Sequence, residues 1–174
     1  SAHIITWYWE FGDSPTNGTS TLENPAYLYA TCGTYNVKLT VTDTNGCDSS
    51  IIVPVIVYCN PDADFNAPSI CFDDLPMNFF DNSSNGTGTI ISWDWQFGDP
   101  PINGTSILQN PTYSYDTCGI YNVILTVTDD LTCTNTDTIP VEVYCQPIAN
   151  FTYTPGCVDS LIAFQNSAIN GTGI

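Results

Sequence analysis

The chain of 174 residues contains one lysine, Lys38, no arginine and one histidine, His3, against 18 acidic residues. Nucleic-acid binding draws much of its affinity from lysine and arginine side chains that contact phosphates, and anionic membrane surfaces attract the same side chains. A formal net charge of −17 therefore argues against both classes of partner. Cations are the natural counter-partners of such a chain, and its acidic surface is expected to keep a secreted protein soluble.

Motifs that mark enzymes and membrane spans are also missing. A catalytic triad needs a histidine, and the only one present is His3. The sequence has no glycine-rich phosphate-binding motif and no C-x-x-C pair that would indicate zinc. No apolar run approaches the length of a membrane-spanning helix. The sequence thus predicts no catalytic residues, no required cofactor and no membrane insertion of this segment.

Cysteine, in contrast, is plentiful. An even number of cysteines in a chain of this size indicates an oxidising compartment, which predicts an extracellular or cell-surface protein. The 8 cysteines are Cys32, Cys47, Cys59, Cys71, Cys118, Cys133, Cys145 and Cys157. We expect all of them to form disulfide bonds.

The sequence repeats itself. The stretch WYWEFGD at residues 7–13 returns as WDWQFGD at residues 93–99, an offset of 86 residues. The same offset superimposes the first four cysteines on the last four. Near the C-terminus the offset shortens, so that Phe80 aligns with Phe164, and NGTG at residues 85–88 aligns with NGTG at residue 170. A repeated sequence of this kind predicts a repeated domain.

Each repeat is predicted to consist of short strands, because no segment has a helical period. In TWYWEF, residues 6–11, large apolar and polar side chains alternate, as is typical of a half-buried strand. The expected core positions are Trp7, Trp9, Phe11, Trp93, Trp95 and Phe97. Pro54 and Pro140 indicate an edge strand or a bulge. Closely spaced turn signals then predict an all-β fold of tandem antiparallel sandwiches.

The motif order W-x-W-x-F-G-D, N-P-x-x-x-Y and G-x-Y-x-V-x-L-T-V-T-D closely resembles the PKD domain, the Ig-like repeat named after polycystic kidney disease. The resemblance covers both copies. The cysteine-bearing, Asn- and Thr-rich version looks most like PKD arrays in large secreted surface proteins of Bacteroidetes-type bacteria. Two features depart from the family pattern. Ser14 and Pro100 follow F-G-D where the family usually has glycine, and the cysteines are more numerous than is common.

The resemblance implies the strand order A, B, C, C′, E, F, G. Strand A would lie near residues 62–66, B near 77–81, C at Trp93, F at Tyr121 and G near 138–143. Residues 1–59 would then be a partial domain of strands C to G, 60–145 a complete domain, and 146–174 a partial domain of strands A and B. Neither partial domain can cover its core alone, because an open sandwich leaves its aromatic face in water. Both a longer array and completion by another copy predict head-to-tail partners.

The implied topology also ranks the disulfides. It places Cys71 and Cys118 at one end of the domain, and Cys59 and Cys133 at the other. Because bonded cysteines have Cα atoms within about 7 Å, it favours a Cys71–Cys118 bond and a Cys59–Cys133 bond at the domain junction. Cys32, Cys47, Cys145 and Cys157 would then pair with flanking domains. The alternative is a bond between strands F and G, joining Cys32 to Cys59 and Cys118 to Cys145.

Two loops that the resemblance brings to one end of the domain carry candidate calcium ligands. Some PKD domains bind calcium, which prefers oxygen ligands. The candidates are Asp81, Asn82, Asp129 and Asp130. Asp13 and Asp99, which end the tryptophan strand, are instead expected to accept N–H groups of a turn.

The sequence also contains candidate glycosylation positions. Asn-x-Ser/Thr sequons occur at Asn17, Asn82, Asn85, Asn103, Asn150 and Asn170. In a bacterium of the suspected group, O-glycans would be attached at Thr138 and Ser160, in DTI and DSL. The alternative for the sequons is ordinary Asn-Gly turn chemistry.

Three functions are compared. The first is a non-catalytic extracellular stalk, adhesin or head-to-tail filament. The second is a module that binds a polysaccharide or a surface protein as an accessory of a larger secreted protein. The third, a carbohydrate-active enzyme, is disfavoured because a small sandwich filled by its own aromatics offers no obvious cleft. A binding module would keep an exposed aromatic strip in both repeats, yet Tyr8 becomes Asp94. The sequence therefore favours the structural function.

Overall fold

The computed structural model describes residues 3–74 and 76–171, and within them the chain is built from β-strands. The helical structure among these residues is a single 3₁₀ turn, η1 (Phe72–Asp74). None of the described residues belongs to a helix long and apolar enough to cross a membrane. The chain divides into unit 1, Ser1–Asn60 with Gly86–Gly88, and unit 2, Pro61–Asn85 with Thr89–Ile174. The domain bounds 1–59, 60–145 and 146–174 stay predictions.

Unit 1 contains an antiparallel sheet of four strands in the order β2-β1-β3-β4. Its strands are β1 (Ile4–Glu10), β2 (Thr19–Ser20), β3 (Gly33–Asp43) and β4 (Asp48–Val57). β1 carries the first tryptophan motif and pairs with β3, so that Trp9 lies opposite Leu39. β4 is the edge strand of this sheet among the described residues, so the missing backbone N–H of Pro54 costs no hydrogen bond to a further strand. The predicted edge position of this proline is confirmed.

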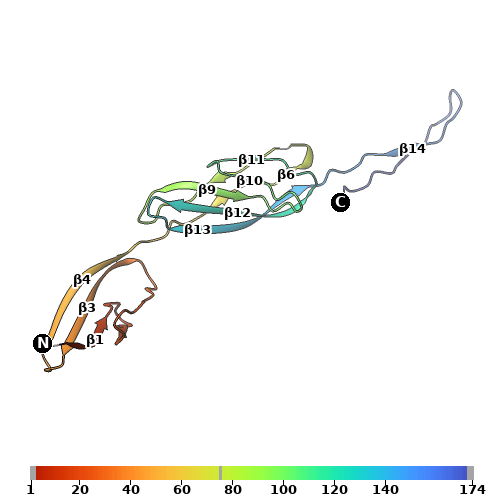
Figure 1. The fold of residues 1–174 in the computed structure, drawn as a ribbon. Helices are drawn as coiled ribbons and strands as arrows, with labels where there is room; N and C mark the ends of the chain where they lie inside the picture. The colour runs from red at the N-terminus through yellow and green to blue at the C-terminus, as the bar shows by residue number, and fades with distance from the viewer. Residues whose placement is uncertain (1–2, 75, 172–174) are drawn as a thin grey trace. The chain divides into compact units, whose positions relative to one another are not determined.

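Unit 2 contains a sheet of five strands in the order β10-β9-β12-β13-β6. β6 runs parallel to β13, and the other neighbours are antiparallel. Two short antiparallel pairs, β5 with β8 and β7 with β11, complete the domain. The bounds are β5 (Phe65–Asn66), β6 (Ile70–Cys71), β7 (Met77–Asn78), β8 (Phe80–Asp81), β9 (Ile90–Gln96), β10 (Thr105–Ser106), β11 (Thr112–Tyr113), β12 (Gly119–Asp129) and β13 (Thr134–Tyr144). In Figure 1, β9, β12 and β13 lie side by side. A further hairpin pairs β14 (Phe151–Tyr153) with β15 (Phe164–Asn166).

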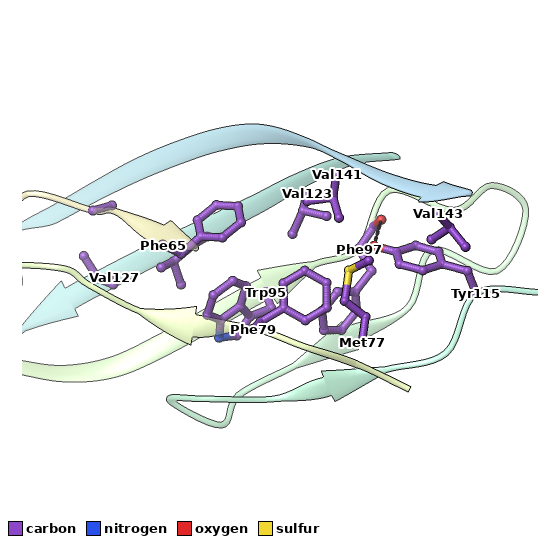
Figure 2. Packing of buried hydrophobic residues seen from close by; sticks show 12 residues of the cluster. Phe65, Met77, Phe79, Trp95, Phe97, Tyr115, Val123, Val127, Val141 and Val143 are labelled. Atoms are coloured by element: carbon purple, nitrogen blue, oxygen red, sulfur yellow. Dashed lines mark hydrogen bonds between the residues drawn. The ribbon is translucent and has the colours of Figure 1, made fainter. Parts of the chain in front are cut away.

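The core of the complete domain is built around Trp95. Phe65 packs edge-on against Trp95 with ring centroids 5.0 Å apart, and Phe79 lies 5.7 Å from the same ring. Figure 2 shows these rings between the strands with Met77 beside them. The members of this cluster that are 0% exposed are Met77, Phe79, Trp95, Val123, Leu125 and Val127. The short pairs thus cover the five-stranded sheet, and the predicted all-β sandwich is confirmed.

The predicted core positions differ in burial between the repeats. Trp95 and Phe97 are buried, whereas Trp93 is half-buried at the edge of the cluster. In unit 1 only Phe11 of the motif is buried, and Trp7 and Trp9 are half-buried. The same alternating sequence therefore forms a closed core in one repeat and an open one in the other.

Candidate functional site

The aspartate of the F-G-D motif closes a loop. Asp99 is buried, and its carboxylate accepts the N–H of Gly104 at 2.9 Å and the hydroxyl of Tyr113. Burial, and then the bond to Asp99, raise the pKa of Tyr113 to about 12, so its hydroxyl stays a donor at neutral pH. The same contacts join the matching residues of the first repeat, Asp13, Gly18 and Tyr27. The predicted acceptance of turn N–H groups is confirmed in both copies.

The glycine of this motif is required by packing. Gly98 has a φ of 69°, and a Cβ there would lie 2.2 Å from the carbonyl oxygen of Asn122. Only glycine allows this conformation and this approach at little cost. The F-G-D motif therefore fixes the end of β9 against β12.

Asp81 links three parts of the complete domain. Its Oδ2 accepts the indole N–H of Trp93 at 2.8 Å and the amide of Gln109 at 2.9 Å. Its Oδ1 accepts the N–H of Ser83 at 3.0 Å. Burial alone would raise the pKa of Asp81, but the hydrogen bonds from these donors outweigh it and lower the pKa. The ionised carboxylate is thus part of the folded structure.

Replacing Asp81 by asparagine is expected to destabilise the complete domain by about 1–3 kcal/mol at pH 7, because an amide N–H₂ would face two donors. The lowered pKa means that the wild-type carboxylate stabilises the fold above the unfolded pKa near 4, and that this contribution is lost as pH falls through the folded pKa. The difference between variant and wild type should therefore shrink below about pH 4. Urea unfolding at pH 7 and pH 3 measures it, and an equal difference at both pH values would contradict this role.

The predicted calcium ligands form separate hydrogen bonds. Asp129 is buried and its Oδ1 accepts the N–H groups of Leu131 and Cys133, while its Oδ2 has no hydrogen-bond partner among the described residues. Asp130 accepts the N–H of Thr89 at 2.8 Å. Within residues 3–74 and 76–171, no three His, Cys, Asp or Glu side chains gather in a way that could hold a metal. Calcium binding at Asp81, Asn82, Asp129 and Asp130 stays a prediction.

The disulfides of the structure join strands F and G. Cys32 is bonded to Cys59 with Cα atoms 4.9 Å apart, and Cys118 to Cys145 at 5.0 Å. The favoured Cys59–Cys133 and Cys71–Cys118 bonds are therefore wrong. β12 and β13 are antiparallel neighbours in which Gly119 faces Val143, so Cys118 and Cys145 both lie just beyond this end of the ladder, close enough to bond.

Half of the cysteines remain unpaired, although we expected all of them to be bonded. They are Cys47, Cys71, Cys133 and Cys157. Cys133 is half-buried, and the other three are exposed.

The candidate glycosylation positions lie at the surface. Asn17 and Asn103 occupy turns with positive φ, and Asn85 uses its side-chain oxygen to accept the N–H of Ile90 at 2.9 Å. All of the positions named from the sequence are exposed: Asn17, Asn82, Asn85, Asn103, Asn150, Asn170, Thr138 and Ser160. Turn chemistry accounts for three of the asparagines, and glycosylation stays a prediction.

Unit 1 presents an incomplete core. In the complete domain Val141 is 4% exposed, whereas Val55 at the matching position of β4 is 38% exposed. Trp95 is fully buried, whereas the matching Trp9 is half-buried. The four strands of unit 1 correspond to C, C′, F and G of the complete domain. The strands that would cover them are A and B.

The β14–β15 hairpin has the opposite character. Phe151 is 62% exposed and Phe164 is 69% exposed, yet the matching Phe65 and Phe79 are 3% and 0% exposed in the complete domain. The hairpin therefore carries the core side chains of an A–B pair without the sheet that would bury them.

The pairing register establishes this match. Phe65 lies opposite Asp81 in β5–β8, and Phe151 lies opposite Asn166 in β14–β15. An offset of 86 for the first strand and 85 for the second therefore aligns Phe164 with Phe79. The predicted alignment of Phe164 with Phe80 is wrong by one residue, and in a strand one residue changes the face on which a side chain lies.

Comparisons with known proteins give a consistent family. The family model described as PKD domain matches residues 1–57 and 59–143. Pre-pro-metalloprotease PrtV of Vibrio cholerae serotype O1 is 28% identical over 144 residues, which is 80% of this chain but 15% of that protein. Collagenase ColA of Bacillus cereus is 41% identical over 58 residues, 33% of this chain and 6% of that protein. The chain thus spans only a small part of these relatives.

Solved structures of PKD domains are also similar. The PKD1 domain of Vibrio anguillarum Epp is 34% identical, covers 50% of this chain and 96% of that chain, and gives a TM-score of 0.45. The PKD1 domain of the Vibrio cholerae metalloprotease PrtV is 34% identical, covers 48% of this chain and 96% of that chain, and gives a TM-score of 0.43. A Bacteroidetes-type origin for the present chain stays a prediction.

Proposed function

The chain belongs to the PKD domain family, and we propose that it is a non-catalytic structural segment of an extracellular repeat array that serves as a stalk, adhesin or filament. The family assignment confirms the tandem Ig-like repeats predicted from the sequence. The relatives are a metalloprotease precursor and a collagenase, and the chain matches only a minor share of each. A minor share is what an accessory segment of a larger secreted protein would match.

One observation carries the structural role: the two partial domains are complementary. Within residues 3–60, the open sheet of unit 1 has no A–B pair, and the β14–β15 hairpin is an A–B pair with exposed Phe151 and Phe164. In the complete domain the matching residues, Phe65 and Phe79, pack against Trp95. We infer that neighbouring repeats or copies complete each other head to tail. Because the surfaces are different, this contact is heterologous and continues without closing.

An extracellular location is supported by two features of the chain. Disulfides Cys32–Cys59 and Cys118–Cys145 persist in an oxidising compartment. The net charge of −17 favours solubility outside the cell and opposes adsorption to anionic surfaces.

Sedimentation velocity over a range of concentrations tests the head-to-tail contact. We expect the chain to form multimers that grow with concentration. Phe164→Asp should weaken association at least about tenfold, because burying a phenylalanine contributes about 1.5–3 kcal/mol and a buried carboxylate opposes docking. Gln165→Asp is the matched control, since Gln165 follows Phe164 in β15, lies on the opposite face of the strand and matches Phe80, which is 48% exposed in the complete domain. A monomer at every concentration, or equal association of Phe164→Asp, would contradict the proposal.

A second candidate function is a binding module for a polysaccharide or a surface protein. It is favoured by a hollow of about 390 Å³ in unit 1 that is lined by Tyr8, Glu10, Lys38 and Ile52 among others. The matching hollow of the complete domain has Asp94 in place of Tyr8 and Ile124 in place of Lys38. The side chains that line this hollow therefore differ between the two repeats, whereas the core residues and the residues at the domain junctions are repeated.

A further inference from the structure

The unpaired cysteines fall into two classes that recur in each repeat. The turn class, Cys47 and Cys133, follows the turn between strands F and G. The edge class, Cys71 and Cys157, precedes strand B, and Cys71 lies on β6 at the edge of the five-stranded sheet. The offset of 86 residues relates the members of each class. Every repeat thus leaves one thiol of each class after its own disulfide has formed.

The two classes lie at opposite ends of the complete domain. Cys71 pairs with Tyr144, next to Cys145, so it marks the trailing end, beside the linker that follows the domain. Cys133 lies at the other end of β13, where Asn135 accepts the N–H of Ala63 at 3.1 Å. This is the leading end, beside the linker that precedes the domain. The 11 residues of β13 separate the two ends by roughly 35 Å at about 3.4 Å per residue.

That separation excludes a bond between the two classes within one domain, since disulfides need Cα atoms within about 7 Å. An edge-class thiol can meet a turn-class thiol only where the trailing end of one domain adjoins the leading end of the next.

The linkers bring those two ends together. Thr87 donates its N–H to the carbonyl of Cys59, and a Cβ on Gly86 would lie 2.2 Å from the same oxygen. A Cβ on Gly86 would also lie 2.3 Å from the carbonyl oxygen of Asn60, and the next linker repeats this contact, because a Cβ on Gly171 would lie 1.8 Å from the carbonyl oxygen of Gln146, which matches Asn60. The loop between strands B and C (the B–C loop, residues 82–89 in the complete domain) is therefore packed directly on the linker that precedes it.

The trailing end of the complete domain lies beside the linker that follows it. Phe72, the neighbour of Cys71, lines a cavity of about 240 Å³ together with Gln146 and Gly171. In the complete domain the turn between β12 and β13 is held to the B–C loop through Asp130 and Thr89. The next domain would hold its own turn beside Gly171 in the same way, and so bring a turn-class thiol toward Cys71.

We propose that a disulfide joins the edge-class cysteine of each domain to the turn-class cysteine of the next, which rests on the proposed head-to-tail completion of domains. Between two copies the bonds are Cys71 to Cys47 and Cys157 to Cys133. Two thiols lose two protons and two electrons to a small disulfide oxidant, which leaves as two thiols. Each cysteine that is unpaired in the single chain would then be bonded to a cysteine of a neighbouring repeat.

A tandem fusion of residues 1–174 to residues 4–174 of a second copy tests this bond without requiring association of separate chains. Joining Ile174 of the first copy to Ile4 of the second gives NGTGIIITW, which has the same spacing as NGTGTIISW at residues 85–93. The fusion is refolded with oxidised and reduced glutathione, denatured without reduction and titrated for thiols. Each copy contributes four unpaired thiols. We expect four thiols in the fusion, and eight if no bond crosses the junction. The single chain, refolded at a concentration too low for association, is the matched control and should also have four.

Peptide mapping without reduction identifies the partners. Links from Cys71 to Cys47 of the second copy, and from Cys157 to Cys133 of the second copy, support the proposal. Eight thiols, or links between members of one class, overturn it. Hydrogen exchange of β3 in the second copy separates the two ideas. If β3 is protected relative to the single chain but eight thiols remain, domain completion holds and the bond is wrong. If β3 is not protected, both are wrong.

Discussion

The free energy of unfolding of the complete domain is expected to fall by about 3–5 kcal/mol when Trp95 is replaced by alanine. Trp95 is fully buried, contacts the rings of Phe65 and Phe79, and donates its indole N–H to the carbonyl of Leu108 at 2.8 Å. Alanine removes all of these contacts and leaves a cavity between the two layers. Because domains are stable by only about 5–15 kcal/mol, this loss is a large fraction of the total.

Trp9→Ala provides the matched control. Trp9 has the same place in the motif and the same type of hydrogen bond, to the carbonyl of Leu22, but it is only half-buried. Its replacement should leave the unfolding of the complete domain unchanged. Urea unfolding followed by far-ultraviolet circular dichroism avoids the loss of tryptophan fluorescence. Equal effects of the two substitutions would show that the sandwich of unit 2 is not closed around Trp95.

Removing the Cys118–Cys145 bond by serine at both positions is expected to destabilise the complete domain by about 3–4 kcal/mol. The bond closes a loop with a sequence separation of 27 residues, and in the chain-entropy model such loops give stabilisation of about this size. Thermal unfolding with and without a reducing agent measures the effect. Reduction should destabilise the complete domain of the wild type but not that of the variant, whose remaining disulfide, Cys32–Cys59, lies in unit 1, and a zinc chelator should affect neither.

Serine at Cys71 and Cys157 is the control for this experiment. Both thiols are exposed and unpaired in the single chain, so the double variant should unfold like the wild type. If it loses as much stability as the first variant, these cysteines are bonded within the chain and the assignment of Cys118 to Cys145 is wrong.

The strands of the sheet could be predicted because their sequences are long and alternate. β12 buries Val123, Leu125 and Val127 on one face, and the period of two alone identifies that pattern. The repetition of the motif supported the prediction of the tryptophan strand, and the strand order of the family indicated where strands A and B lie. The burial of the predicted core could not be read from one motif. Trp9 and Trp95 have the same local sequence, and only the presence of the covering strands separates them.

The short strands and the disulfides were predicted less well, for a physical reason. β5 and β8 contain two residues each, so no alternation fixes their register and the tail was aligned one residue off. The disulfide ranking required every cysteine to find a partner, which penalised the bond between strands F and G. The register of β12 with β13 determines whether that bond can form, and this register could not be predicted from the sequence alone.

The bond between Cys118 and Cys145 also determines how a stretched array would lengthen. A pulling force that reaches Cys118 is transmitted through the disulfide bond to Cys145. It therefore does not extend the chain between the two cysteines, whose sequence separation is 27 and which contains all of β12 and β13. At about 3.3–3.6 Å per extended residue, the bond withholds roughly 90 Å of contour length from a repeat that would otherwise release roughly 300 Å. The longest strand pair of each repeat would therefore bear no load. It would stay paired under force, and the rest of the repeat could refold onto it when the force is released.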